Sequence, residues 1–380
     1  MLRKNIIFIL FAATSLIAAE DDVAYQNKSA DPLFIQKEQK KSTDQLKAKT
    51  KKAIEEDDSL ELSSPSRIYT KEGADVYATI DFLCFKAKEN GLYYAHAVAG
   101  PGSQNLDPSE YDINGGLQKV VPDWDPAFRL GLGFNLPYDD WDFFAQWTHL
   151  KTDAKHSTND ELVMLWAHSN IHHFHYKSRW AKAKWKLKLN MFDMDLGRGF
   201  YIGERFSLRP SFGIATVFIK QAFKINNLYY ASDHLHNDID LYAVNYPKSD
   251  YTGAGIKAAL DARFYFIRQL SILAAADGSM YYGKFNADFY EKENETKVAY
   301  TRDRFNMGIN HFHLALGLVF DIFYGKNDNH LGFQMTWEQS MFFGVNQMNH
   351  YRFRFIEGIF SQHNDDLSLQ AIAVKLRWDF

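Results

Sequence analysis

The sequence lacks cysteine pairs, long apolar runs and an excess of positive charge. Cys84 is the single cysteine in 380 residues, so no internal disulfide holds the fold together. We expect Cys84 to be a small side chain without a specific role or, at most, to form one disulfide with another molecule. Beyond the N-terminus no segment approaches the roughly 18 consecutive apolar residues of a spanning helix, which excludes a helical membrane protein. The net charge of −4 argues against a nucleic-acid partner.

Signatures of catalysis are also missing. The metalloprotease pattern HExxH and the nucleophile pattern GxSxG do not occur. His172, His173 and His175 cluster in one polar segment and a second group lies within 233–238, but neither has partners at the fixed spacing that a metal or catalytic site requires. We therefore predict that the protein is not an enzyme and uses no metal and no cofactor.

Aromatic residues, in contrast, are abundant. They make up 16% of a chain whose mean hydropathy is −0.37, and alternating strands reconcile the two values because polar neighbours mask the apolar face. The last residues show this alternation clearly: one strand face carries Ile372, Val374, Leu376, Trp378 and Phe380, and the other carries Ala373, Lys375, Arg377 and Asp379. We interpret Phe380, Trp378 and Leu376 as the closure signal of a transmembrane β-barrel; a strand of a soluble all-β domain is the alternative.

Three parts follow one another along the chain. Residues 1–19 have a basic start, an apolar stretch and small residues at 18–19, which predicts a secretory signal peptide. Residues 20–75 are rich in Lys, Gln and Glu, and we expect a polar periplasmic tail that is largely disordered or partly helical. Residues 76–380 form the predicted outer-membrane barrel.

Alternating runs recur throughout this third part. In each run apolar residues occupy every second position and polar or small residues lie between them. The runs begin near Phe128, Trp141, Trp185, Leu208, Ile256, Leu270, Phe312 and Leu331. Their number, rather than any single run, favours a transmembrane barrel over a soluble sandwich.

Short and long connections alternate between these runs. Short turns are expected near 137–140, 197–205, 267–269 and 325–329, and long polar segments near 99–126, 152–180, 223–250, 284–305 and 345–366. Outer-membrane barrels have short periplasmic turns and long outer loops, and a closed ring of this kind has an even number of strands. The fold class predicted is therefore an all-β, transmembrane antiparallel barrel of about ten strands, or about twelve if 76–98 is split and 351–356 is added.

Several stretches carry a family resemblance. They are 78–83 leading to 90–94, 124–133, 140–142 followed by Trp147 and Thr148, 208–213 followed by 219–221, and 337–339. Together they resemble the pore-forming major outer membrane proteins of Legionella and of chlamydia-related bacteria. The resemblance spans roughly 76–380 and implies an outer-membrane porin of a Gram-negative bacterium. The single cysteine departs from the cysteine-rich, disulfide-linked chlamydial members, which puts a crosslinked envelope network in doubt.

A porin of this kind needs charged side chains facing its lumen. Lysines spaced by two form the strongest candidate set, and single residues on other strands join them. The predicted lumen residues are Lys184, Lys186, Lys188, Arg129, Arg209, Lys257, Arg263, Asp261, Glu338 and Arg377. Basic residues outnumber acidic ones in this set, so we predict diffusion of small hydrophilic solutes and ions with a mild anion preference. The alternative is a structural or adhesive surface barrel whose charges pair across a closed lumen.

Residues 159–167 are expected to form a short N-capped helix. It either folds into the barrel mouth and narrows it, or meets a neighbouring protomer. The partners predicted are the lipid bilayer, small solutes, the outer-membrane assembly machinery through the C-terminal strand, and a second copy in a homo-oligomer. Long aromatic-rich outer loops would also suit adhesion to host surfaces.

Overall fold

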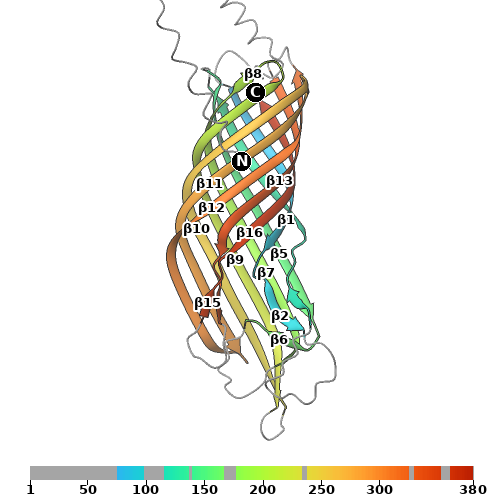
Figure 1. The fold of residues 1–380 in the computed structure, drawn as a ribbon, viewed down its shortest axis with the longest axis vertical. Coiled ribbons are helices and arrows are strands. Elements are labelled where there is room, and N and C mark those ends of the chain that lie inside the picture. The colour runs from blue at the N-terminus through green and yellow to red at the C-terminus, as the bar shows by residue number, and fades with distance from the viewer. Residues whose placement is uncertain are drawn as a thin grey trace, which may run out of the picture. The chain divides into compact units, whose positions relative to one another are not determined.

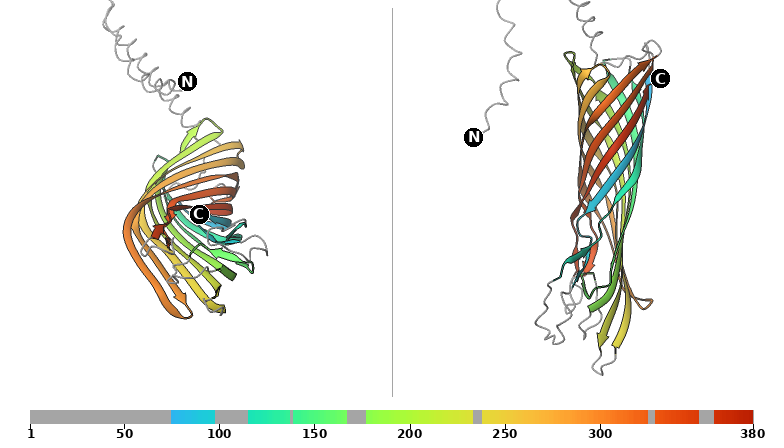
Figure 2. Two further views of the ribbon diagram at one scale, coloured as in Figure 1. Left: turned by 60° about the horizontal axis from the view of Figure 1, so that its bottom comes forward. Right: turned by 90° about the vertical axis from the view of Figure 1, so that its right-hand side faces the viewer.

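Ten long antiparallel strands close into a barrel in the computed structural model (Figures 1 and 2). The structure describes residues 75–97, 115–136, 139–166, 177–232, 238–324, 329–351 and 360–379. The barrel strands are β1 (Asp75–Glu89), β4 (Trp124–Asn135), β5 (Trp141–Thr158), β7 (Lys177–Arg198), β9 (Phe206–Ser232), β10 (Asp238–Ile267), β11 (Leu270–Glu293), β12 (Thr296–Tyr324), β13 (Asn329–Asn346) and β16 (Asp365–Asp379). No helix in these ranges is long and apolar enough to cross a membrane.

The ring is an up-and-down barrel that closes between its first and last strands. Each barrel strand pairs with the next one along the chain, and β1 pairs with β16 from Tyr77 opposite Asp379 to Glu89 opposite Leu367. The ten-strand prediction, with the last strand beside the first, is confirmed. Because closure pairs every strand on both sides, the ring has no free edge.

The described residues also contain six short strands that lie outside the ring order. They are β2 (Tyr93–Ala97), β3 (Leu117–Lys119), β6 (Leu162–Met164), β8 (Phe200–Ile202), β14 (Asn349–Tyr351) and β15 (Phe360–Gln362). At one end of the barrel β6 links β2 to β7, and β14 pairs with β15. Only β8 lies at the opposite end, beside the start of β9.

The predicted short turns at 197–205 and 267–269 lie at this second end, the periplasmic one, where β1 begins and β16 ends (Figure 1). Residues 137, 138 and 325–328, which make up much of the other two predicted turns, lie outside the described residues. Two predicted long loops, however, are strand: β9 and β10 cover most of 223–250, and only Asn294 and Glu295, both with positive φ, separate β11 from β12. That part of the prediction is wrong. Beyond the lipid an outward side chain has no need to be apolar, so the alternation fades while strand pairing continues.

A belt of apolar side chains surrounds the periplasmic half of the barrel. On β12, Phe312 is 59% exposed and Leu316 is 56% exposed, and every other barrel strand contributes similar residues to the belt. Further members include Phe82, Leu132, Phe143, Phe192, Ile214, Ile256, Met280, Trp337 and Val374. So much exposed apolar surface is stable only against acyl chains, which identifies the membrane-spanning zone.

Beyond the belt the two faces exchange polarity. On β7 the outward residues Phe192 and Met194 give way to Lys188 and Lys186, while the inward Trp185 becomes fully buried. One hydrophobic cluster at this level contains side chains from all ten barrel strands. The outer half of the barrel is therefore built like a water-soluble protein, with its apolar core inside.

Residues 1–74 and Phe380 lie outside the described residues. The signal peptide (1–19), almost all of the periplasmic tail (20–75) and the terminal aromatic of the closure signal therefore stay predictions. The other two residues of that signal, Leu376 and Trp378, face the lipid belt on β16.

Candidate functional site

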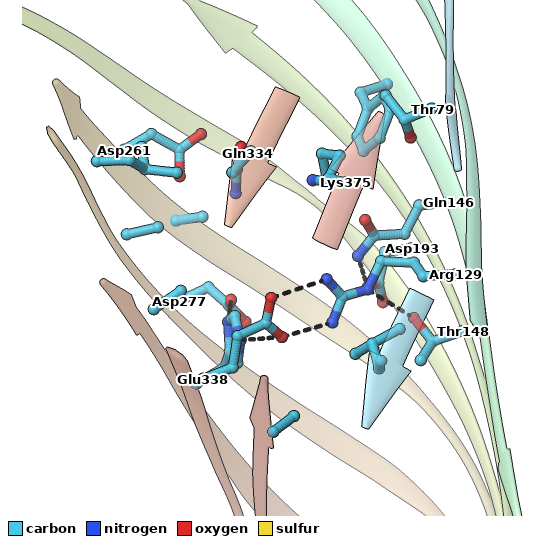
Figure 3. A pocket seen from close by; sticks show the side chains of 18 of the residues that line it. Thr79, Arg129, Gln146, Thr148, Asp193, Asp261, Asp277, Gln334, Glu338 and Lys375 are labelled. Atoms are coloured by element: carbon cyan, nitrogen blue, oxygen red, sulfur yellow. Dashed lines mark hydrogen bonds and ion pairs between the residues drawn. The ribbon is translucent and has the colours of Figure 1, made fainter. Parts of the chain in front are cut away.

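Charged and polar side chains fill the barrel interior at the height of the lipid belt. All ten barrel strands contribute to a cavity of about 230 Å³ (Figure 3). The inward charged groups are Arg129, Arg209, Lys257, Arg263, Lys375 and Arg377 on the basic side, and Asp81, Asp142, Asp193, Asp195, Asp261, Asp277, Asp321, Glu338 and Asp379 on the acidic side. Acids outnumber bases, and most of these groups are paired with one another.

Arg129 on β4 is the centre of the largest network. Its Nη1 and Nη2 donate to the two oxygens of Glu338 on β13 at 3.3 and 2.9 Å (Figure 3). The Arg129 Nη1 also donates to Asp81 at 3.1 Å, and its Nε donates to Thr148 at 3.2 Å. Since β1 and β16 lie between β4 and β13, the fork-shaped Arg129–Glu338 pair reaches across part of the lumen.

The same network continues to the opposite wall through a histidine. The His313 Nε2 lies 3.2 Å from Glu338, and its Nδ1 lies 2.7 Å from Asp277 on β11. Thr336 donates to Glu338 at 3.1 Å. A continuous line of polar contacts thus runs through the cavity from β1 to β11.

Two further ion clusters bridge strands that are not neighbours. Lys257 on β10 is buried between Asp193 at 3.4 Å and Asp195 at 3.2 Å, both on β7. Arg209 on β9 donates from Nε to Asp142 on β5 at 2.7 Å and from Nη1 to Asp261 at 3.3 Å. Lys257 with its two partners spans β9, and the Arg209–Asp142 pair spans β7, so each cluster links strands that have one strand between them.

A histidine-centred cluster lies close to the periplasmic end. The two ring nitrogens of His330 lie 2.6 Å from Asp379 and 2.8 Å from Asp321. The Arg377 Nε donates to Asp379 at 3.0 Å, and the Arg377 guanidinium lies over the Tyr77 ring at 3.8 Å. This cluster ties β12 and β13 to the closing pair β1 and β16.

Two chain segments fold inward at the outer mouth and meet there. The register of β13 shifts around Gly344, whose positive φ of 63° favours glycine, and residues 345–349 are buried inside the barrel. The Ser249 hydroxyl on β10 donates to the Val345 carbonyl at 3.4 Å, although β11 and β12 lie between these strands. Residues of this segment therefore cross the mouth instead of following its rim.

The second inward segment is 162–166. Its Trp166 is 2% exposed, donates from Nε1 to the Tyr93 carbonyl at 2.6 Å, and packs against Phe223 at 5.6 Å between ring centroids. His350 lies 4.7 Å from Trp166, ring to ring, and contacts the Leu165 carbonyl. The two segments and the hydrophobic cluster below them cover the charged cavity from the outside.

The predicted helix at 159–167 is wrong, because Leu162–Met164 form β6. These residues pair with β2, and the Leu165 amide continues the ladder by donating to the Tyr94 carbonyl at 3.0 Å. Pairing with an otherwise open strand outweighs the local helical preference. Of the two positions predicted for this segment, the structure has the one in the barrel mouth.

Seven of the predicted lumen residues line the cavity: Arg129, Arg209, Lys257, Arg263, Asp261, Glu338 and Arg377. Lys184, Lys186 and Lys188 do not, and their prediction is corrected. They alternate with the fully buried Trp185, Leu187 and Leu189, so they lie on the outer surface of β7 beyond the lipid belt. In this half of the barrel the apolar face points inward.

Sequence reasoning missed several inward carboxylates, among them Asp81, Asp193 and Asp195. Each carboxylate alternates with belt residues such as Phe82, Phe192 or Met194, which is a signal that the sequence contains. The histidines at 172, 173 and 175 lie outside the described residues, as do 233–237.

Comparison with solved structures finds several outer-membrane barrels of low identity. The outer membrane protease OmpT from Escherichia coli matches at 9% identity with a TM-score of 0.39, over 83% of this chain and 99% of that one. The attachment invasion locus protein Ail of Yersinia pestis matches at 10% identity with a TM-score of 0.25, over 81% and 99%. The Pseudomonas putida toluene transporter TodX matches at 8% identity with a TM-score of 0.22, over 83% and 92%. No activity is transferred from them.

Among the curated proteins no significant match was found. In contrast, the model of one family matches residues 74–380, which include the whole barrel. That family is described as the Legionella pneumophila major outer membrane protein precursor. Together with the lipid belt and the closed ring, this match shows that the chain belongs to the Legionella major outer membrane protein family and lies in the outer membrane of a Gram-negative bacterium.

Proposed function

We propose that this protein is a surface barrel with a closed lumen, whose main role is structural or adhesive. The observation that carries the proposal is the meeting of residues 345–350 with residues 162–166 across the outer mouth. Below this contact Trp185, Phe223 and Phe285 are fully buried, so apolar side chains fill the interior at their level among the residues that the structure describes. The long β9–β10 and β11–β12 hairpins then present a broad polar surface outside the membrane.

A planar-bilayer experiment tests this proposal. The full-length protein, refolded in detergent, is expected to insert without producing steady single-channel current. Heat-dependent migration on gels and a β-rich circular dichroism spectrum serve as controls for folding. A steady ohmic conductance from folded protein would overturn the closed-lumen proposal and support the second candidate.

The second candidate is a porin for small hydrophilic solutes, favoured by the polar cavity of about 230 Å³ at membrane height. Six acidic and six basic side chains line that cavity, so we expect an open lumen to show little preference for ions of either sign, in place of the mild anion preference expected from the sequence. The reversal potential in a salt gradient distinguishes these preferences. We propose no enzymatic role for either candidate.

A further inference from the structure

Eight lysines form a basic surface on the outside of three adjacent strands. They are Lys151 and Lys155 on β5, Lys182, Lys184, Lys186 and Lys188 on β7, and Lys220 and Lys224 on β9. Every inward neighbour between them on β7 is buried, which fixes their outward direction. We refer to these eight residues as the outer lysine patch.

Strand register brings these lysines into rows. Lys151 is opposite Lys188, which is opposite Lys220, and a second row joins Lys155, Lys184 and Lys224. Neighbouring strands are about 4.8 Å apart, and like charges directly opposite each other are destabilising. A sequence that keeps two such rows requires a compensating negative charge.

The protein supplies little of that charge itself. Asp153 lies 2.7 Å from Lys184, and Asp250 on β10 is opposite Lys220. No other ion pair to these lysines is found within the described residues. A surface of eight lysines with two nearby acids therefore remains strongly positive and fits a polyanion.

The position of the patch indicates which polyanion fits. On the same outward faces the belt residues Trp147, Phe192 and Phe218 come directly before the lysines, and His149 and Asn190 mark the boundary, 2.8 Å apart. The patch lies on the side of the belt opposite to the periplasmic turns, so it is level with the head groups of the outer leaflet.

The rest of the barrel does not repeat these rows within the described residues. On β13 and β16 the outward residues just beyond the belt include Gln339 and Ser368, which bond to each other at 2.7 Å, and Gln370. Outward cations do occur on β11 and β12, but Lys284 is opposite Asn306, Arg304 is opposite Asn286 and Arg302 is opposite Asp288. Rows of three lysines across three neighbouring strands therefore distinguish β5, β7 and β9 from the other strands.

We propose that the outer lysine patch binds the phosphate groups of an outer-leaflet lipid, a phosphorylated glycolipid of the lipid A type. Its acyl chains lie against the belt residues of β5, β7 and β9, and its phosphates lie between the lysine rows. A soluble sulfated polysaccharide would use the lysines alone, whereas this lipid uses both adjoining surfaces. The proposal concerns the outer wall and is independent of whether the lumen conducts.

Titration of the full-length protein in detergent with fluorescent bisphosphoryl lipid A tests the proposal. The patch variant K186Q/K188Q/K220Q is compared with the control variant K284Q/R302Q/R304Q, which removes three exposed outward cations on β11 and β12. Each lysine near an anionic membrane surface contributes about 1 kcal/mol, which is somewhat less than a tenfold change in affinity. The patch variant, which lacks three of them, is expected to bind lipid A on the order of 100-fold more weakly. The control variant is expected to stay within about threefold of the parent.

Further arms identify the ligand. The arginine variant K186R/K188R/K220R is expected to retain binding, dephosphorylated lipid A to bind poorly, and millimolar inorganic phosphate to compete weakly. Equal loss in the patch and control variants would overturn the proposal. So would tighter binding of heparin than of bisphosphoryl lipid A, because it would assign the patch to a soluble polyanion. Heat-dependent gel migration verifies that each variant is folded.

Discussion

Arg129 illustrates how single residues hold this interior together. Its guanidinium satisfies Glu338, Asp81 and Thr148 at once while 13% of its side chain is exposed. Removing one partner of a buried ion pair leaves the other charge without compensation, which costs far more than an exposed pair. Arg129 therefore matters for stability mainly because, without it, the carboxylates of Glu338 and Asp81 would lose their shared cation.

We expect Arg129→Met to lower the free energy of unfolding by about 3–5 kcal/mol, because Glu338 and Asp81 then lose their shared cation. Urea titration in detergent micelles, followed by tryptophan fluorescence, measures this. The control Arg198→Gln breaks a partly exposed pair with Asp139 and should cost about 1 kcal/mol or less. Similar losses in both variants would contradict the interpretation.

Glu89 leads to a prediction about pH. It lies beyond the lipid belt, where burial, with the carboxylates of Asp365 and Asp366, raises the pKa of Glu89 well above its ordinary value. The folded protein then binds more protons than the unfolded one above pH 4.5, so this residue's contribution is most favourable below that pH and is lost as pH rises toward the raised pKa.

We therefore expect Glu89→Gln to stabilise the barrel at neutral pH by about 1–3 kcal/mol and to flatten the pH dependence of the urea midpoint. Glu295→Gln, in the exposed β11–β12 hairpin, is the matched control and should leave that dependence unchanged. An unaltered pH profile in Glu89→Gln would contradict this expectation.

At the scale of elements, β7 shows what the sequence could predict and what it could not. Strand period, the short turns at 197–205 and 267–269, and closure between the first and last strands are confirmed, whereas the long loops predicted at 223–250 and 284–305 are mostly strand. Alternation alone does not tell which face points inward, however, and the apolar set changes from odd to even positions between Met191 and Phe192. That change marks the edge of the membrane, and overlooking it placed three lysines in the lumen.

The mouth segments were beyond sequence reasoning for another reason. Residues 162–164 owe their strand conformation to β2, and residues 345–349 are buried by contacts to β10 and β11, so partners distant in sequence decide both. The intrinsic preference of a short segment for helix or strand contributes little free energy compared with such pairing.

Trp166→Ala provides a test at this scale. Removing its ring leaves a void beside Phe223 and His350 and takes away the hydrogen bond to Tyr93. We expect a loss of about 3–5 kcal/mol in urea titration and faster protease cleavage between 159 and 166. Trp124→Ala, on the outer surface at 46% exposure, is the control and should change stability by only about 0.5 kcal/mol. Equal protease resistance in the two variants would show that the mouth does not depend on Trp166.

At the scale of the whole molecule, the exchange of polarity fixes the depth of insertion. Leu316 and Asn306 lie on the same face of β12, one within the lipid belt and one beyond it. Leu316→Arg is expected to cost about 2–4 kcal/mol in lipid vesicles, since arginine near the bilayer midplane is unfavourable. Asn306→Arg should change stability by about 0.5 kcal/mol or less. Equal costs at the two positions, measured by urea titration in vesicles, would place the belt elsewhere.

The two opposed solvation patterns along each strand also make misassembly costly. A slip of one residue between neighbouring strands turns every side chain to the other face. In the periplasmic half that slip would put carboxylates such as Asp193 among acyl chains, and in the outer half it would put aromatic rings such as Phe223 into water. The lipid around the periplasmic half and the water around the outer half therefore both disfavour a shifted strand. A single alignment of the ten strands satisfies both environments.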